Sequence, residues 1–231
     1  MIDFSRFEKT AEIYFKNKNL LKQAFTHRSY VNESKNPGLE HNERLEFLGD
    51  AVLELVVTEY LYSKYPTATE GDLTSYRSAL VNANTLSEIA RKLGVNEFLL
   101  LSKGEAKDEG RARLYILANT IEAIIGAIFM DEGYEAAKNF ISKNVFHLID
   151  KIVEEKTWLD SKSYFQEQAQ EHTGITPSYK TLKEEGPDHE KHFTVGVYLG
   201  SELVIAGEGN SKQEAEQDAA RKALEKKGWL K

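Results

Sequence analysis

Four acidic side chains recur three or four residues apart along one stretch of the chain, a spacing that gathers them on one face of a helix. They are Glu43, Glu46, Asp50 and Glu54. Leucine and valine fill the opposite side. Carboxylates gathered against an apolar surface are costly unless a cation neutralises them, and a hard divalent cation with oxygen ligands suits such a group. An ordinary amphipathic helix with a solvated acidic face is the alternative, and spacing alone does not separate the two.

A second stretch, residues 115–131, is apolar nearly all round, which predicts a buried helix. Its strongly polar interior positions, Asn119 and Glu122, are three residues apart and therefore share a face. A lone Glu in such a helix is also explained by a structural hydrogen bond to a neighbouring helix. Two apolar helices that each carry oxygen ligands favour a facing pair with a metal ion between them.

Composition describes a globular chain. Of its 231 residues 41% are hydrophobic and 29% charged, and there is no cysteine, which excludes disulfides and thiolate metal sites. The N-terminus lacks a signal-peptide pattern and no run of about 18 apolar residues is uninterrupted, so we expect a cytoplasmic protein that does not enter a membrane. The net charge of −7 is only a weak argument against nucleic-acid binding, because local patches make phosphate contacts.

The first part of the chain is predicted to be all-α. Helices are expected from the N-terminus to about residue 35, then from the acidic stripe to about Tyr65, where Pro66 ends it, and at 73–80, 83–93, 115–131 and 134–155. His27 closes an early helical segment, as a structural hydrogen-bonding residue or a proton donor. The polar loop at 99–114 carries four cations, which are either solvated or placed to meet phosphates. They are Lys103, Lys107, Arg111 and Arg113.

The pattern changes at a predicted linker, residues 156–161. A helix at 162–172 is followed by strands at 178–184, 192–199 and 202–208, and by a helix to about Lys227 that Ser211 caps, with Glu214 completing a capping box. The predicted fold class is therefore α plus an α/β sandwich. An all-α domain at 1–155 precedes a small α-β-β-β-α domain at 162–231.

Residues 43–50, Glu-Arg-Leu-Glu-Phe-Leu-Gly-Asp, resemble the signature of bacterial ribonuclease III, and the likeness extends from Phe15-Lys16 through residues 24–30 to the C-terminus. The resemblance implies a homodimeric endonuclease, without a small-molecule cofactor, that uses Mg²⁺, or Mn²⁺ in its place, to cut double-stranded RNA. It implies processing of ribosomal and other structured precursor RNAs, with 5′-phosphate and 3′-hydroxyl ends. By the same resemblance the metal ligands are Glu46, Asp50, Asn119 and Glu122, and the catalytic acids are Asp50, Glu122, Glu43 and Glu70.

The resemblance also places Phe47 at the dimer interface, inserted into the other subunit. The residues alone leave open whether Phe47 packs inside its own chain instead. A pair of subunits related by twofold symmetry would supply two sites for the two strands of a duplex.

The α-β-β-β-α order resembles a double-stranded RNA-binding domain. The RNA contacts that this resemblance implies are Gln166, Glu167, Gln170, His189, Ser211, Lys212 and Gln213. Amides, carboxylates and imidazoles suit 2′-hydroxyls of the minor groove, and a helix N-terminus with an adjacent Lys suits phosphates.

Two departures from the family pattern affect the expectation. The family usually has Asp at position 119 and commonly has two lysines at 212–213, where this chain has Asn119 and Lys212-Gln213. A neutral amide still ligates a hard cation but brings no charge. The alternative is therefore a catalytically weak or inactive duplex-RNA-binding dimer. A small-substrate phosphohydrolase is a third reading, but it leaves the C-terminal domain unexplained.

Overall fold

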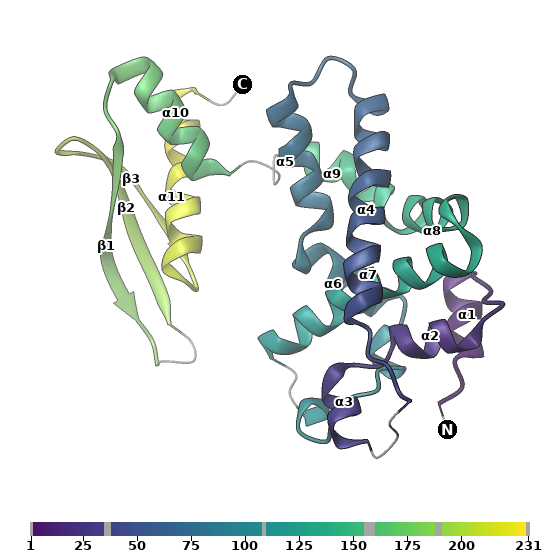
Figure 1. Ribbon diagram of the computed structural model, residues 1–231. Helices are drawn as coiled ribbons and strands as arrows, with labels where there is room; N and C mark the ends of the chain where they lie inside the picture. The colour runs from purple at the N-terminus through teal and green to yellow at the C-terminus, as the bar shows by residue number, and fades with distance from the viewer. Residues whose placement is uncertain (1, 35–37, 108–109, 155–159, 188–190, 230–231) are drawn as a thin grey trace. The chain divides into compact units, whose positions relative to one another are not determined.

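Separate apolar cores divide the chain into two units, Met1–Trp158 and Leu159–Lys231 (Figure 1). The computed structural model describes residues 2–34, 38–107, 110–154, 160–187 and 191–229. The first unit is helical, as predicted. Its α-helices are α1 (Ser5–Ala11), α2 (Lys18–Ala24), α3 (Arg28–Glu33), α4 (Glu43–Lys64), α5 (Glu70–Val81), α6 (Ala83–Lys92), α7 (Arg111–Glu132), α8 (Tyr134–Val145) and α9 (Ile149–Glu154). Short 3₁₀ turns are η1 (Val95–Glu97), η2 (Glu105–Lys107) and η3 (Phe146–Leu148).

Helix α7 is the centre of the first unit. It packs most extensively against α4, and α6, α8 and α2 contact it as well. Its length and apolar composition would suffice for a membrane span, with a mean hydropathy of 1.5 over its most apolar 18 residues. The core helix of a folded domain has the same composition, and 61% of that window is buried within the protein. The burial accounts for the apolar character without a membrane.

Three helical boundaries differ from the prediction, the first being that of α5, which begins at Glu70 and not at residue 73. Helix α7 begins at Arg111, one turn before residue 115, so the predicted loop is shorter. The single helix predicted at 134–155 is broken into α8, η3 and α9. The Phe146 ring stacks on Tyr60 with centroids 3.7 Å apart, and Ile149 is fully buried. The break allows Phe146 to stack on Tyr60 of α4. No local signal in the sequence predicts this contact.

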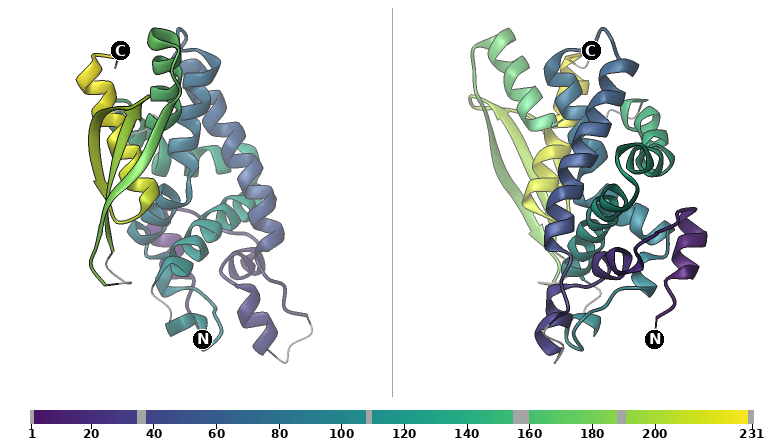
Figure 2. Two further views of the ribbon diagram at one scale, coloured as in Figure 1. Left: turned by 90° about the vertical axis from the view of Figure 1, so that its left-hand side faces the viewer. Right: turned by 45° about the vertical axis from the view of Figure 1, so that its right-hand side comes forward.

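The second unit consists of α10 (Ser161–Thr173), the strands β1 (Pro177–Glu185), β2 (His192–Leu199) and β3 (Glu202–Gly209), and α11 (Lys212–Lys227). The strands form an antiparallel sheet in the order β1-β2-β3, and both helices cover one face of it (Figure 2). The alternation predicted for β2 is observed, because Phe193, Val195, Val197 and Leu199 are all buried. The predicted fold class is confirmed.

Close packing of α11 on the sheet depends on glycine. A Cβ atom at Gly207 would lie 2.1 Å from the backbone nitrogen of Ala219, so no side chain fits there. Ser211 caps α11 as predicted, accepting a hydrogen bond from the backbone N–H of Glu214 at 3.1 Å. The Glu214 carboxylate, however, accepts from the backbone N–H of Asn210, not from that of Ser211. Of the predicted linker, residues 156–159 lie outside the described residues, and Ser161 already belongs to α10.

Candidate active site

The candidate site lies where α4 crosses α7, and two glycines bring the helices into backbone contact (Figure 1). A Cβ atom at Gly49 would lie 1.7 Å from the carbonyl oxygen of Glu122, and one at Gly126 would lie 2.1 Å from the carbonyl oxygen of Leu45. Neither position therefore accepts any side chain. Glycine inside a helix costs about 1 kcal/mol relative to alanine. An interior glycine in each of two long helices was thus a usable signal of a close crossing, which the sequence analysis missed.

This crossing brings together acids from both helices. Burial, together with repulsion from Asp50, Glu46 and Glu54, raises the pKa of Glu122 from 4.5 to about 8. Burial and the charges of Glu43 and Asp50 also raise the pKa of Glu46. The side chain of Asn119 opposes that rise through a hydrogen bond, in which its amide donates to the Glu46 carboxylate.

The donor set fits a hard divalent cation. Among the residues that the structure describes, no three Asp, Glu or His side chains converge closely enough to hold a metal ion as they stand. The chemistry of the group is nevertheless suitable, because Glu46, Asp50, Glu122 and Asn119 offer only oxygen ligands once the Asn amide turns its carbonyl inward. Carboxylates that raise one another's pKa also create the negative field that a cation relieves.

The two further predicted catalytic acids lie in different surroundings. Glu43 begins α4 between a guanidinium and an imidazole, with Arg28 Nη1 at 3.6 Å and His41 Nδ1 at 3.8 Å. Its charge acts on Glu46, so it borders the crossing. Glu70 begins α5, is exposed, and accepts a hydrogen bond from Thr74 Oγ1 at 3.2 Å. Glu70 is not among the charges that shift the pKa of Glu46 or of Glu122.

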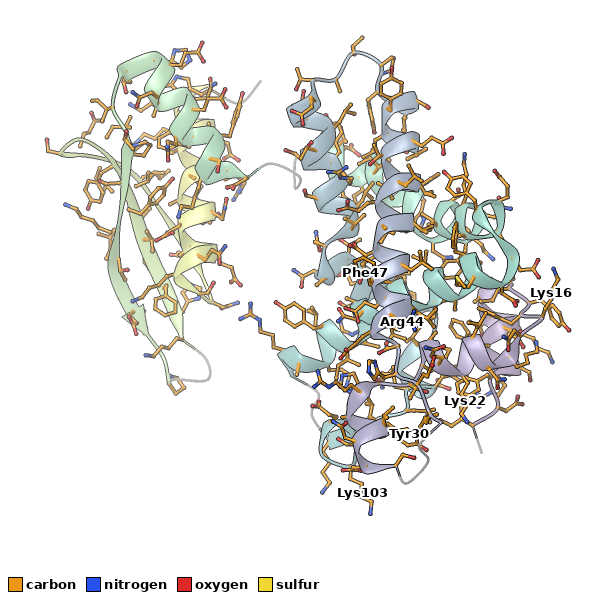
Figure 3. The ribbon with its side chains drawn as sticks, in the orientation of Figure 1. Lys16, Lys22, Tyr30, Arg44, Phe47 and Lys103 are labelled. Atoms are coloured by element: carbon orange, nitrogen blue, oxygen red, sulfur yellow. The ribbon has the colours of Figure 1, made fainter. Side chains whose placement is uncertain are left out.

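Three of the four predicted loop cations are exposed, namely Lys103, Lys107 and Arg111. Lys103 lies beside α3 (Figure 3), where its backbone N–H donates to the Glu33 carboxylate at 3.2 Å. Arg113 differs from the expectation. It is 9% exposed, and its guanidinium donates to Asn96 Oδ1 at 3.0 Å and to the Glu105 carbonyl at 2.6 Å. Arg113 therefore ties two turns together and is not placed to meet phosphates.

The residues predicted to contact RNA in the second unit lie on its surface where the structure describes them. Gln166, Glu167 and Gln170 are exposed along α10 and line a shallow hollow. Lys212 and Gln213 are exposed in the first turn of α11, directly after the capping Ser211. His189 lies outside the described residues.

Phe47 projects away from its own chain. It is 81% exposed on α4, next to Arg44 (Figure 3), which excludes packing inside the subunit. It borders a hollow lined by apolar and polar side chains, among them Leu20, Gln23, His41, Leu48 and Met130. Met130 is itself 59% exposed, so two large apolar side chains on this face are left uncovered by the described residues.

His27 serves a structural purpose. Its Nδ1 lies 2.8 Å from the hydroxyl of Ser29, which in turn accepts a hydrogen bond from the backbone N–H of Ser102 at 3.0 Å. Burial lowers the pKa of His27, so the ring is held neutral near pH 7. These contacts correspond to the hydrogen-bonding alternative.

Comparison with known proteins shows the family to which the chain belongs. A family model described as Ribonuclease-III-like matches residues 17–149, and one described as Double-stranded RNA binding motif matches residues 161–227. The chain belongs to the ribonuclease III family. Ribonuclease 3 of Carboxydothermus hydrogenoformans is 47% identical over 218 residues, which are 94% of this chain and 93% of the relative. Ribonuclease 3 of Bdellovibrio bacteriovorus is 44% identical over 230 residues, 98% of both chains.

The structural comparison gives the same family. The ribonuclease III nuclease domain of Campylobacter jejuni is 44% identical, covers 62% of this chain and 98% of its own, and superposes with a TM-score of 0.55. The predicted family and enzyme class are thus confirmed. This ribonuclease III is an endoribonuclease whose C-terminal domain is of the double-stranded-RNA-binding type.

Proposed function

We propose that this ribonuclease III hydrolyses double-stranded RNA with a divalent cation, Mg²⁺ or Mn²⁺, held at the crossing of α4 and α7. The observation that carries the proposal is the raised pKa of Glu122, to which the charges of Asp50 and Glu46 contribute, together with the raised pKa of Glu46 beside Asn119. A partly buried carboxyl with a pKa of about 8 would be mostly protonated at pH 7. A cation bound at this position would displace that proton, and the carboxylates that repel one another without metal would become its ligands.

The residues divide the work according to where they lie. Glu46, Asp50, Asn119 and Glu122 would hold the cation, which when bound acidifies water and stabilises the negative charge of the pentacoordinate phosphate. Asp50 and Glu122, which are ligands as well as catalytic acids in this proposal, would also orient the attacking water. Glu43 would act from the rim, where Arg28 and His41 hold its carboxylate. The hydrolysis leaves a 5′-phosphate and a 3′-hydroxyl end.

Glu70 requires a different explanation because it does not perturb this cluster. Its exposed position at the start of α5 is suited to a role toward substrate or toward a second subunit. We include it as a catalytic acid that completes the site only in the assembled, RNA-bound dimer.

A homodimer is part of the proposal. Phe47 and Met130 expose an apolar surface beside a hollow on the same face, so a twofold axis would let each Phe47 enter the partner's hollow. The Campylobacter jejuni nuclease-domain structure is described as having a region involved in dimer formation. Two sites related by symmetry would cut the two strands of one duplex.

Two surfaces would bind the RNA. The exposed cations Lys103 and Lys107 precede α7, which carries half of the candidate site, and the exposed Arg111 is its first residue. In the C-terminal domain, α10 offers amide and carboxylate side chains and α11 begins with Ser211 and Lys212. His189 belongs to the same proposed set. Precursors of ribosomal RNA and other structured RNAs in the cytoplasm are the substrates that we propose.

The alternative function is a duplex-RNA-binding dimer that cuts weakly or not at all. Asn119 favours it, because an amide contributes no charge to the ligand set. Its hydrogen bond to Glu46 argues for the enzyme, since that bond opposes the rise in the pKa of Glu46 and so favours the ionised form that binds a cation. We therefore place a slow but competent nuclease first.

A cleavage assay separates the two functions. Purified protein is incubated with labelled duplex RNA and Mg²⁺, alongside Glu122→Gln, Asn119→Asp and, as a matched control, Glu88→Gln, an exposed acid of α6. The nuclease predicts cleavage by the wild type and by the control, and none by Glu122→Gln, which still binds RNA. Asn119→Asp should lower the Mg²⁺ concentration needed for half-maximal cleavage about tenfold, since each added charge strengthens a hard-cation site. Binding without cleavage in the wild type, with cleavage gained by Asn119→Asp, would establish the alternative.

A further inference from the structure

At the end of the C-terminal sheet, one carboxylate is shared by two lysines. Glu184 Oε1 lies 2.9 Å from Lys191 Nζ, and Glu184 Oε2 lies 3.7 Å from Lys212 Nζ. The hydrogen bond from Lys191, followed by the charges of Lys191 and Lys212, lowers the pKa of Glu184 below its ordinary value, so the carboxylate is ionised at neutral pH. All three side chains are partly open to solvent. The arrangement is a surface ion-pair cluster in which Glu184 contacts both lysines.

The position of the cluster follows from strand register. Glu184 pairs across the sheet with Phe193, whose side chain is buried on the helical face. Because the side chains of directly paired residues project from the same face of a sheet, Glu184 points to the face on which α11 lies. Lys212, in the first turn of α11, has its Nζ 5.6 Å from the centre of the Phe193 ring. Glu184 therefore lies under the end of α11 that the proposed function assigns to RNA phosphates.

We propose that Glu184 limits the affinity of this domain for RNA, by occupying Lys212 and Lys191 as a phosphate would. This inference rests on the proposed function, in which Lys212 meets the RNA backbone. A carboxylate offers the ammonium groups the same anionic oxygens that a phosphate offers. An incoming phosphate must therefore displace or share the Glu184 oxygens. A lysine that is already neutralised adds less to the release of counterions that drives binding to a polyanion.

Such a restraint is useful to a nuclease that releases its product. Cleaved duplexes carry the same phosphates as the substrate, so unrestrained lysines would hold products as tightly as precursors. Glu184 weakens the contact with both, and the loss is largest at low salt, where counterion release contributes most.

The neighbouring acid supplies a matched control. Glu185 follows Glu184 on β1 and, by strand alternation, points to the opposite face, where it pairs with Lys183 at 2.8 Å. Replacing either acid by Gln changes the net charge of the chain by the same amount. Only Glu184 touches Lys212, so a difference between the two variants reports on the local contact and not on total charge.

The test is the affinity of the full-length protein for a fluorescein-labelled RNA duplex, measured by anisotropy in EDTA over a series of KCl concentrations. At about 0.1 M KCl, Glu184→Gln is expected to bind about fivefold more tightly than the wild type, and its log–log salt dependence should be steeper by about one. Glu185→Gln should stay within about twofold of the wild type.

A double-mutant cycle identifies the lysine through which Glu184 acts. Lys212→Gln should weaken binding about twofold in the wild type but about fivefold in the Glu184→Gln background, because only there is the lysine available to phosphate. Unchanged or weaker binding by Glu184→Gln, or an equal gain by Glu185→Gln, overturns the inference while leaving duplex binding intact. A wild type that does not bind the duplex overturns the proposed function itself, and the inference with it.

Discussion

Replacing Glu122 by Gln tests the candidate site without relying on catalysis. In the metal-free protein the pKa of Glu122 is about 8, against an ordinary value of 4.5. Below pH 4.5 both the folded and the unfolded chain carry the proton, so Glu122 does not lower the free energy of unfolding. As the pH rises from about 4.5 toward 8, the unfolded chain releases the proton and the folded chain retains it, so stability falls. Above about pH 8 the loss is complete.

The magnitude follows from the size of the shift. At about 1.4 kcal/mol per pH unit, the rise in pKa corresponds to an upper limit of about 5 kcal/mol. Glu122 is only partly buried, and solvent screening reduces that limit to about 2 kcal/mol. Gln has a similar shape and does not titrate. The stability of Glu122→Gln relative to wild type should therefore increase by about 2 kcal/mol between about pH 4 and pH 8.5.

The assay is urea unfolding in EDTA, followed by the helical circular dichroism signal, which arises mostly from the first unit. Other groups titrate in both proteins, so their contributions cancel in the difference. Mg²⁺ should stabilise the wild type more than the variant at about pH 8.5, since only the wild type has the full ligand set. If the two proteins lose stability in parallel as the pH rises, Glu122 is not in the negative field described above, and the account of the crossing is wrong.

Three further predictions concern the crossing, the loop and the exposed aromatic. Gly126→Ala should lower the free energy of unfolding by about 3 kcal/mol and abolish cleavage, because its Cβ atom would meet the Leu45 carbonyl at 2.1 Å; urea unfolding and the cleavage assay measure both, and a stable, active variant would contradict the backbone contact. Arg113→Ala should cost about 2 kcal/mol of stability by removing the hydrogen bonds to Asn96 and Glu105 that tie two turns together, whereas Arg111→Ala should leave stability unchanged and weaken RNA binding about threefold; urea unfolding and anisotropy would show the reverse pattern if Arg113 faced RNA. Phe47→Ala should shift the protein from dimer to monomer in sedimentation velocity without lowering monomer stability, since the ring is 81% exposed; an unchanged dimer would remove Phe47 from the interface.

Elements with strong local signals were predictable from the sequence. Pro66 ends the acidic helix one residue after Tyr65, the C-cap of α4. Strict alternation along 192–199 gave the bounds of β2 as observed. The shared face of Asn119 and Glu122 follows from helical spacing alone. Each of these features depends on residues close in sequence.

Features that depend on distant contacts were not predictable in the same way. The break after Val145 depends on stacking between Phe146 and Tyr60, which are far apart in the chain. Arg111 and Arg113 look alike in sequence, and only the position of two turns decides that the second is buried. Likewise, helical spacing placed the acids on faces but could not show that those faces meet, which depends on where α4 and α7 cross.

The contact between main chains at Gly49 and Gly126 also affects how the protein tolerates mutation. Where helices are spaced by side chains, every change of core volume alters their separation. Here the separation at the crossing is fixed by atoms that all amino acids share, so larger or smaller aliphatic residues elsewhere in the core can be exchanged without retuning the distance between the acidic groups. Amino-acid substitutions in the surrounding core are therefore compatible with a constant geometry of the acidic groups. A redesigned nuclease could keep these two helices unchanged inside a new scaffold.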